Sequence, residues 1–183
     1  KNGVEEGLVY LEVTGGAYGM RDFAGPETFS PTVFLYADAR PLIGDLAREG
    51  IRAITLGDTR WKRRDMKTVQ LASANAWIVD AEGRLITREL SHSILPGITR
   101  AGVASLLAAS GLEMVERAFT PEEAASAKEV FTTSSGAIVA PVIALDGKPI
   151  GDGKPGPVTR RIQRLYYEAM GADVAAVAPW ALG

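Results

Sequence analysis

The chain has 183 residues, of which 46% are hydrophobic and 23% are charged, and its formal net charge is −2. These values are typical of a globular protein with one good-sized domain, or one domain and a fragment, and they provide no overall positive field that would attract nucleic acid. The chain has no cysteine and a single histidine, His92, which excludes disulfides, zinc–thiolate sites, cysteine nucleophiles and two-histidine metal motifs. We therefore expect no metal site.

The longest uninterrupted apolar run, residues 137–145, is far too short to span a bilayer, so we expect no membrane contact. The chain does not open with a positively charged segment followed by an apolar one, as a signal peptide would. The absence of cysteine fits a cytoplasmic protein, which is the location we expect. Because the first residue is lysine, we expect a native N-terminus to precede it.

The N-terminal part of the chain predicts two strands joined by a long loop. Residues 8–14 alternate and are rich in branched and aromatic side chains, and residues 32–36 form the second strand. The loop 15–31 is long for a structureless connection, which favours a function for it. Its Arg21 is a candidate anion ligand, although an exposed loop arginine explains it equally well. The pattern breaks at 37–41, where we place a domain boundary.

Short strands and turns follow that boundary. We expect strands at 51–56, 129–133 and 138–145, and a hairpin of 76–79 with 84–87 around Asp80-Ala81-Glu82-Gly83. Asp146-Gly147 is a turn.

Four helices are expected between these strands, because capping residues mark their ends or apolar residues recur at helical spacing. The first covers 41–49 and ends at Gly50. The second has an apolar face of Ile98, Gly102, Val103, Leu106 and Leu107 and ends at Gly111. The third begins with the capping box Thr120-Pro121-Glu122-Glu123. The fourth carries Val158, Ile162, Leu165 and Ala169 on one face and ends at Gly171, and we expect the Ala-rich tail after it to be loosely attached.

A basic run precedes the hairpin: Arg60-Trp61-Lys62-Arg63-Arg64-Asp65-Met66-Lys67. A solvated basic face would not need Trp61 or the apolar–polar alternation that follows Lys67. This form suits a chain that passes from the surface into a pocket with Lys67 at the entry. Burial and neighbouring cations disfavour the ammonium, and a neutral lysine is a nucleophile towards aldehydes. The alternative is a basic surface patch, which is the commoner role of such runs.

Three further segments could bind an anion. Gly97 precedes a helix start, whose free backbone N–H groups and dipole suit phosphate, and Thr99 adds a hydroxyl unless it only caps the helix. Thr132-Thr133-Ser134-Ser135-Gly136 places hydroxyls at a strand end, and Ser73-Ala74-Asn75 is a weaker candidate. A nucleophilic lysine with two phosphate cradles suits pyridoxal 5′-phosphate (PLP), which carries an aldehyde and a phosphate.

Taken in order, these segments resemble the fold-type IV PLP enzymes, most closely the D-amino acid aminotransferases. The resemblance runs from about Leu8 to Met170 and rests on these residues: Arg60-Trp61, Asp65-Met66-Lys67, Val69-Gln70-Leu71, Ser73-Ala74-Asn75, residues 94–100, Thr133-Ser134-Ser135, and residues 146–160. It implies an α+β fold with two domains and PLP in the cleft between them. Residues 1–37 would be the remainder of a small N-terminal α/β domain, 38–41 a linker, and 42–183 the large C-terminal pseudo-barrel domain.

The resemblance also implies roles for individual residues. Lys67 would bind the cofactor covalently and transfer the proton. The cofactor-binding residues would be Lys67, Arg60, Ser73, Asn75, Leu95, Gly97, Ile98, Thr99, Ser134 and Ser135, with Leu95 packing on the ring. The substrate-binding residues would be Arg21, Ser135 and Gly136.

Three departures from the family pattern stand out. Only the last part of the N-terminal domain is present, without an arginine that normally also holds the phosphate. About thirty residues are missing between Leu71 and Ala72, including a glutamate that binds the pyridine nitrogen. We interpret this gap as an omitted segment, since a real deletion would weaken the electron sink. Finally, Arg21-Asp22-Phe23 stands where the D-specific members have an Arg-x-His clamp.

We therefore predict a homodimeric aminotransferase that converts D-alanine and 2-oxoglutarate to pyruvate and D-glutamate. One alternative keeps PLP and Lys67 but changes the reaction to that of an (R)-amine or branched-chain aminotransferase, or of an aminodeoxychorismate lyase. An alternative of another class is a non-enzymatic nucleic-acid-binding protein that uses residues 60–67. The net charge and the lack of further aromatic residues in that run argue against it.

Overall fold

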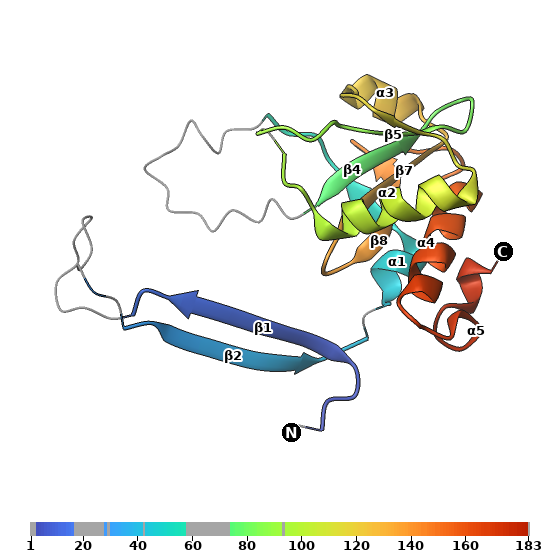
Figure 1. The fold of residues 1–183 in the computed structure, drawn as a ribbon. Helices are drawn as coiled ribbons and strands as arrows, with labels where there is room; N and C mark the ends of the chain where they lie inside the picture. The colour runs from blue at the N-terminus through green and yellow to red at the C-terminus, as the bar shows by residue number, and fades with distance from the viewer. Residues whose placement is uncertain are drawn as a thin grey trace. The chain divides into compact units, whose positions relative to one another are not determined.

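The computed structural model describes residues 3–16, 28, 30–41, 43–57, 74–92 and 94–182. The chain divides into two compact units, Lys1–Leu42 and Ile43–Gly183 (Figure 1). Within the described residues, no helix has the length and apolar character needed to cross a membrane.

The first unit contains an antiparallel pair of strands, β1 (Gly7–Thr14) and β2 (Thr32–Ala39). Tyr10 lies opposite Tyr36, and their rings stack with centroids 5.2 Å apart. Both predicted strands are confirmed, but the expected break in pattern at Ala37 is wrong. The strand continues through Ala39 because β1 supplies partners as far as Gly7, which pairs with Ala39.

Apolar side chains on this hairpin remain exposed. Val9, Leu11 and Val13 share one face, and they are 68%, 60% and 62% exposed. The residues opposite Leu11 and Val13 are Leu35 and Val33, which are also exposed. Two strands alone are marginally stable in water, so the hairpin gains little from burial within the described residues.

The second unit is built on a seven-stranded sheet with the order β3-β8-β7-β4-β5-β6, and β9 pairs with β8. The strands are β3 (Ile51–Ala53), β4 (Asn75–Val79), β5 (Leu85–Thr87), β6 (Met114–Glu116), β7 (Glu129–Ser134), β8 (Ile138–Leu145) and β9 (Lys148–Pro149). Among these described strands, only β3 with β8 and β5 with β6 pair in parallel. The hairpin predicted around residues 80–83 is confirmed as β4 and β5. The predicted strand 51–56 is shorter, and β6 was not predicted.

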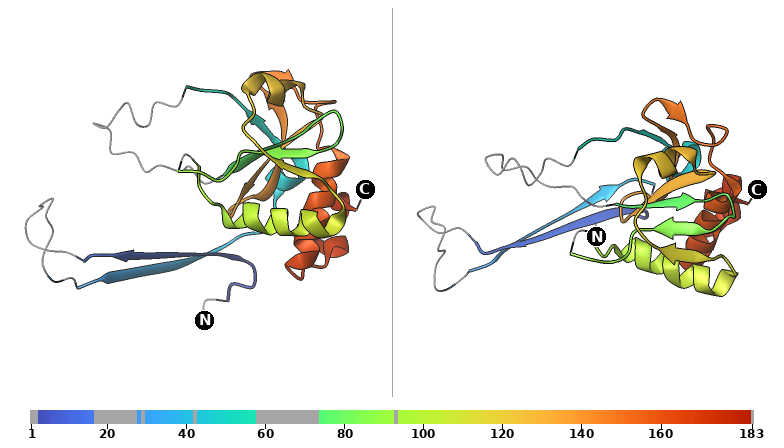
Figure 2. Two further views of the ribbon diagram at one scale, coloured as in Figure 1. Left: turned by 45° about the horizontal axis from the view of Figure 1, so that its top comes forward. Right: turned by 90° about the horizontal axis from the view of Figure 1, so that it is seen from above.

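Successive side chains along each strand point to opposite faces of the sheet, and a hydrophobic core lies on each face. Trp77 and Phe131 belong to one core, with their rings stacked 5.6 Å apart, whereas Ile78 belongs to the other. Helices α2 (Ile98–Ser110) and α4 (Pro157–Ala169) pack into the core that contains Trp77, and they stay adjacent in both views of Figure 2. Helix α3 (Pro121–Ser126) contributes to the opposite core.

The predicted helix signals are largely confirmed. Helix α2 ends at Gly111 in the left-handed conformation, and Thr120 and Glu123 form the predicted capping box of α3. Helix α1 (Asp45–Glu49) is shorter than expected. Ile98 does not belong to the apolar core face of α2, because its side chain is 80% exposed.

The expectation of a loosely attached tail is wrong. After α4, the chain forms α5 (Val174–Val177) and the 3₁₀ turn η1 (Pro179–Ala181). Val174, Ala178 and Ala181 are buried in the core. Trp180 meets the ring of Tyr167 edge-on at 6.2 Å and lies 4.4 Å from the guanidinium of Arg160. Small alanines let this segment approach α4 closely, so an Ala-rich composition here indicates packing.

A buried carboxylate on β7 fixes the start of α4. Glu129 is 7% exposed and accepts hydrogen bonds from the N–H groups of Val158 at 2.9 Å and Thr159 at 2.7 Å, and from the Thr159 hydroxyl at 2.7 Å. These donors belong to the first turn, where a helix leaves N–H groups without intrahelical partners. A Cβ at Gly156 would overlap the Glu129 side chain, so glycine is required there.

We expect Glu129→Gln to lower the free energy of unfolding by about 1–3 kcal/mol, because a charged acceptor is replaced by an amide that cannot accept all three bonds. The measurement is urea unfolding followed by tryptophan fluorescence. Glu168→Gln on α4 is the matched control. Its side chain is 53% exposed and 4.0 Å from Arg164, so it should change stability by less than about 0.5 kcal/mol. Equal midpoints for both variants would contradict this role of Glu129.

Candidate active site

A pocket of ≈190 Å³ opens beside the start of α2. It is lined by Leu95, Pro96, Gly97, Ile98, Thr99, Thr133, Ser134 and Ser135. Two segments were proposed separately as phosphate sites, the helix start at 95–100 and the hydroxyl-rich residues 132–136. Their parts 95–99 and 133–135 form the walls of a single pocket. A liquid water occupies about 30 Å³, so the pocket has room for a phosphate group.

The start of α2 presents backbone N–H groups at this pocket. Gly97 is the N-cap residue, and among the described residues no side chain caps the helix. The first intrahelical donor is Ala101, whose N–H binds the Gly97 carbonyl at 3.0 Å. The N–H groups of Ile98 and Thr99 precede it and, with the dipole of α2, favour an anion. The interpretation of Thr99 as the helix cap is therefore wrong; Thr99 lies inside the helix and is 3% exposed.

The other wall is the turn between β7 and β8. Ser134 ends β7, and its Oγ accepts a hydrogen bond from the Ala137 N–H at 3.1 Å. The hydroxyl proton of Ser134 is not used in that bond. Ile138 follows with a φ of 56°, a conformation that β-branched residues rarely adopt and that costs free energy. The turn is therefore held in one shape, with Ser134 and Ser135 facing the pocket.

Thr133 also lines the pocket, as expected for the hydroxyl-rich segment 132–136, although the family resemblance implies no cofactor contact for it. Its Oγ1 accepts a hydrogen bond from Trp77 Nε1 at 3.0 Å, and the residue is 1% exposed. Thr133 thus connects the pocket to the core. A threonine among several hydroxyl residues at a strand end was the only signal available from sequence.

Arg100 is a buried cation in the first turn of α2. It is 4% exposed, and its guanidinium lies 5.8 Å from the Trp77 ring. One guanidinium nitrogen pairs with Glu116 at 2.5 Å and binds the Arg88 carbonyl at 3.1 Å. Because Glu116 offsets the charge of Arg100, the attraction of the pocket for anions rests mainly on backbone N–H groups and hydroxyls.

The remaining predicted site residues divide into three groups. Arg21, Arg60, Lys67 and Ser73 lie outside the described residues. Leu95 and Ile98 line the pocket with side chains that are 52% and 80% exposed, so they leave apolar surface for a ring to pack on. Gly136 and Asn75 do not line it; Asn75 lies behind the 95–97 segment, where its Nδ2 donates to the Leu95 carbonyl at 2.9 Å.

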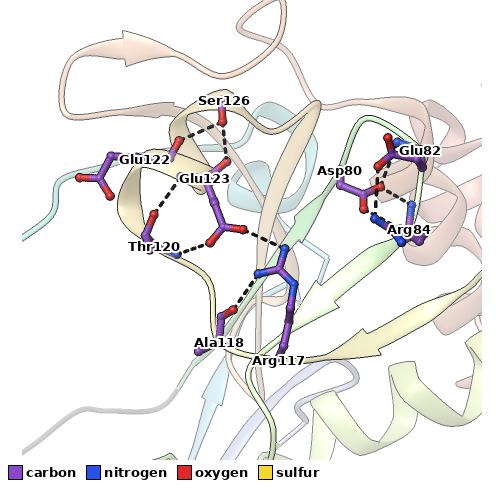
Figure 3. Close-up of polar contacts among 9 residues, drawn as sticks. All are labelled: Asp80, Glu82, Arg84, Arg117, Ala118, Thr120, Glu122, Glu123 and Ser126. Atoms are coloured by element: carbon purple, nitrogen blue, oxygen red, sulfur yellow. Dashed lines mark hydrogen bonds and ion pairs between the residues drawn. The ribbon is translucent and has the colours of Figure 1, made fainter.

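A second pocket, of ≈270 Å³, is lined by a charged cluster that includes Asp80, Glu82, Arg84, Arg117 and Glu123 (Figure 3). Arg84 pairs with Asp80 at 2.8 Å and with Glu82 at 3.3 Å, and Arg117 pairs with Glu123 at 2.8 Å. Each of these five side chains has an oppositely charged partner within the cluster. We interpret this cluster as structural. Its ion pairs stabilise the β4–β5 turn internally and connect α3 to Arg117, which directly follows β6.

Ion pairing in this cluster moves carboxylate titration away from neutral pH. Burial opposes ionisation of Asp80, but hydrogen bonds from the Arg84 backbone and guanidinium outweigh it and lower the pKa of Asp80. The hydrogen bond from Arg117, followed by that from the Thr120 N–H, lowers the pKa of Glu123. Neither carboxylate is suited to exchange protons near pH 7.

Comparison with known proteins agrees with this geometry. Residues 68–145 match the family model for class IV aminotransferases. A D-alanine aminotransferase of Staphylococcus aureus is 30% identical over 195 residues, which cover 90% of this chain and 68% of that protein. Those 195 aligned residues exceed the 183 of this chain, so the alignment includes positions that this chain lacks.

Solved structures share the fold. A branched-chain amino acid aminotransferase of Escherichia coli superposes with a TM-score of 0.73 at 25% identity, covering 88% of this chain and 65% of that one. A branched-chain amino acid aminotransferase of T.th., solved with pyridoxamine 5′-phosphate, is 34% identical with a TM-score of 0.51, covering 60% of this chain and 34% of that one. This chain thus spans about two thirds, or less, of the length of these relatives.

The charged cluster predicts an acid-sensitive contribution to stability. A carboxylate with a lowered folded-state pKa stabilises the protein fully above its unfolded-state pKa of about 4, and the contribution is lost as the pH falls through the folded-state pKa. We therefore expect Asp80→Asn to lower the melting temperature at neutral pH and to reduce the further drop between about pH 6 and about pH 3. Glu122→Gln is the control, because its carboxylate points away from the cluster in Figure 3. Parallel pH profiles for wild type and Asp80→Asn would contradict this expectation.

Proposed function

The chain belongs to the class IV aminotransferase family, and from that premise we propose that it is a PLP-dependent transaminase of D-amino acids. The observation that carries the proposal is the meeting of the α2 N-terminus with the hydroxyls of the β7–β8 turn in one pocket. A dianionic phosphate is the ligand best matched by backbone N–H groups and hydroxyl donors that converge in this way.

The residues of the pocket fit the cofactor. The N–H groups of Ile98 and Thr99, with the hydroxyls of Thr99, Ser134 and Ser135, would hold the phosphate. Leu95 would pack on the ring. When bound, PLP supplies an electron sink for the electrons released at the substrate α-carbon. A relative solved with pyridoxamine 5′-phosphate supports this cofactor.

Lys67 would perform the chemical steps that belong to the protein. Its amine would bind the cofactor aldehyde until a substrate amine replaces it. The released lysine would then accept the α-proton as a general base and, as a general acid, would deliver it to the carbon of the cofactor that carried the aldehyde. Arg60 and the other cations of the run, Lys62, Arg63 and Arg64, would favour its neutral form at neutral pH. Arg60 and Ser73 would complete the cofactor site.

D-Alanine and 2-oxoglutarate are the substrates we propose, with pyruvate and D-glutamate as products. The similarity to a D-alanine aminotransferase supports this choice. Arg21 would bind the substrate carboxylate, with Ser135 and Gly136 beside it. The structural similarity to branched-chain enzymes favours a second candidate, a branched-chain amino acid aminotransferase. We also propose that the protein acts as a homodimer in the cytoplasm.

We expect Lys67→Ala to abolish covalent cofactor binding and to lower the transamination rate by about 10²–10⁴-fold or more, because the acid–base group is lost. Visible absorbance of the PLP-loaded protein and product formation are the two measurements. Lys148→Ala is the control and should retain both properties, because Lys148 is an exposed lysine of β9 that does not line the pocket. Near-wild-type transamination by Lys67→Ala would overturn the assignment.

We expect D-alanine to react with the PLP-loaded protein and L-alanine not to react, because the lysine would reach only one face of the cofactor and a carboxylate held by Arg21 would direct the α-proton of the D enantiomer to that face. Stopped-flow absorbance with each enantiomer measures this directly. A faster reaction with L-alanine would refute the D-specific proposal. A faster reaction with branched L-amino acids than with either alanine would establish the second candidate.

A further inference from the structure

Asn75 connects the two walls of the pocket without lining it. It is the first residue of β4, is 7% exposed, and lies opposite Thr133 in the β4–β7 pairing. Its Nδ2 donates to the Leu95 carbonyl at 2.9 Å. The side chain thus joins the strand next to one wall, at Thr133, to the segment that forms the other wall.

The contact between Asn75 and the 95–97 segment is closely fitted. A Cβ at Gly97 would overlap Oδ1 of Asn75, so the asparagine occupies space that only glycine leaves free. The Leu95 carbonyl that accepts from Asn75 also accepts from the Gly97 N–H at 2.9 Å. Gly97 is the N-cap of α2, so these contacts fix where the helix begins.

We propose that Asn75 is a positioning residue that sets the α2 N-terminus for phosphate binding, acting through the Leu95 carbonyl. The inference rests on the proposed function, since the phosphate is that of PLP. Without the Nδ2 donor, the 95–97 turn can shift, and the N–H groups of Ile98 and Thr99 no longer converge with the hydroxyls of Ser134 and Ser135. Positioning of this kind affects affinity for the phosphate, which the backbone N–H groups would bind, more than affinity for the ring, which only the flexible Leu95 side chain would contact.

The test compares ligands with and without the phosphate. Tryptophan fluorescence titrations give the Kd of wild type and Asn75→Ala for PLP, for pyridoxal and for inorganic phosphate. We expect Asn75→Ala to weaken PLP and inorganic phosphate about fivefold, as for the loss of one hydrogen bond, and to leave pyridoxal within about twofold. Unchanged phosphate and PLP affinity, or an equal loss for PLP and pyridoxal, would overturn the proposal.

Thr87→Val is the matched control for a general loss of stability. Thr87 is also buried and also donates to a backbone carbonyl, that of Ala76 at 2.9 Å, but it does not line the pocket. Thr87→Val should lower the melting temperature and leave all three affinities unchanged. If it weakened PLP as Asn75→Ala does, the effect of Asn75 would be one of stability only, and the proposal would fail.

A double-mutant cycle tests the contact itself. Gly97→Ala should weaken phosphate binding in the wild-type background, because the added methyl overlaps Asn75. In the Asn75→Ala background that overlap is absent, and Gly97→Ala should have little further effect. Additive effects would overturn the proposed contact. If the wild type bound inorganic phosphate but not PLP, the proposed function would be overturned, and the titrations with inorganic phosphate would still decide the role of Asn75. If the wild type bound neither ligand, both proposals would be overturned.

Discussion

Strands β4 and β7 pair with Asn75 opposite Thr133, and both walls of the pocket depend on that register. β7 leads directly into the serine turn, whereas β4 carries the side chain that holds the segment before α2. A shift of one residue would exchange Trp77 and Ile78 between the two cores, where neither side chain would fit the space left by the other. The stacked rings of Trp77 and Phe131 therefore help to fix the register and, with it, the distance between the two walls of the pocket.

In the pocket, the groups proposed to contact the phosphate differ from the groups that hold them in place. The donors are ordinary: backbone N–H groups at a helix start and hydroxyls in a turn. Their arrangement depends on buried neighbours, which are Asn75 behind Gly97, Trp77 behind Thr133 and the strained Ile138 after the serine turn. Each supporting group lies in or next to the sheet, so the donors rest on a rigid framework.

Local signals in the sequence predicted much of this arrangement. Gly97 and Gly111 mark the ends of α2, and Thr120 with Glu123 marks the start of α3, because capping depends on residues a few positions apart. The contact of Asn75 with the Leu95 carbonyl could not be predicted in this way, since the two residues are distant in sequence and meet only in the folded structure. The attachment of Ala178 and Ala181 was missed for a similar reason: small side chains give no periodic signal, and what buries them is the surface of α4.

The contact between Glu129 and Gly156 has a consequence for how this sequence can change. The carboxylate occupies the volume that any side chain at 156 would need, and it also supplies the acceptors for the first turn of α4. The two positions are far apart in the chain, yet they are coupled. Position 156 cannot accept a larger residue while Glu129 is present, and position 129 cannot accept a shorter residue without leaving the first turn of α4 uncapped. A replacement at 156 becomes tolerable only after 129 has shortened, and by then α4 must have acquired another cap. Substitutions at these two positions should therefore arise in a fixed order along any evolutionary path, with the new cap first.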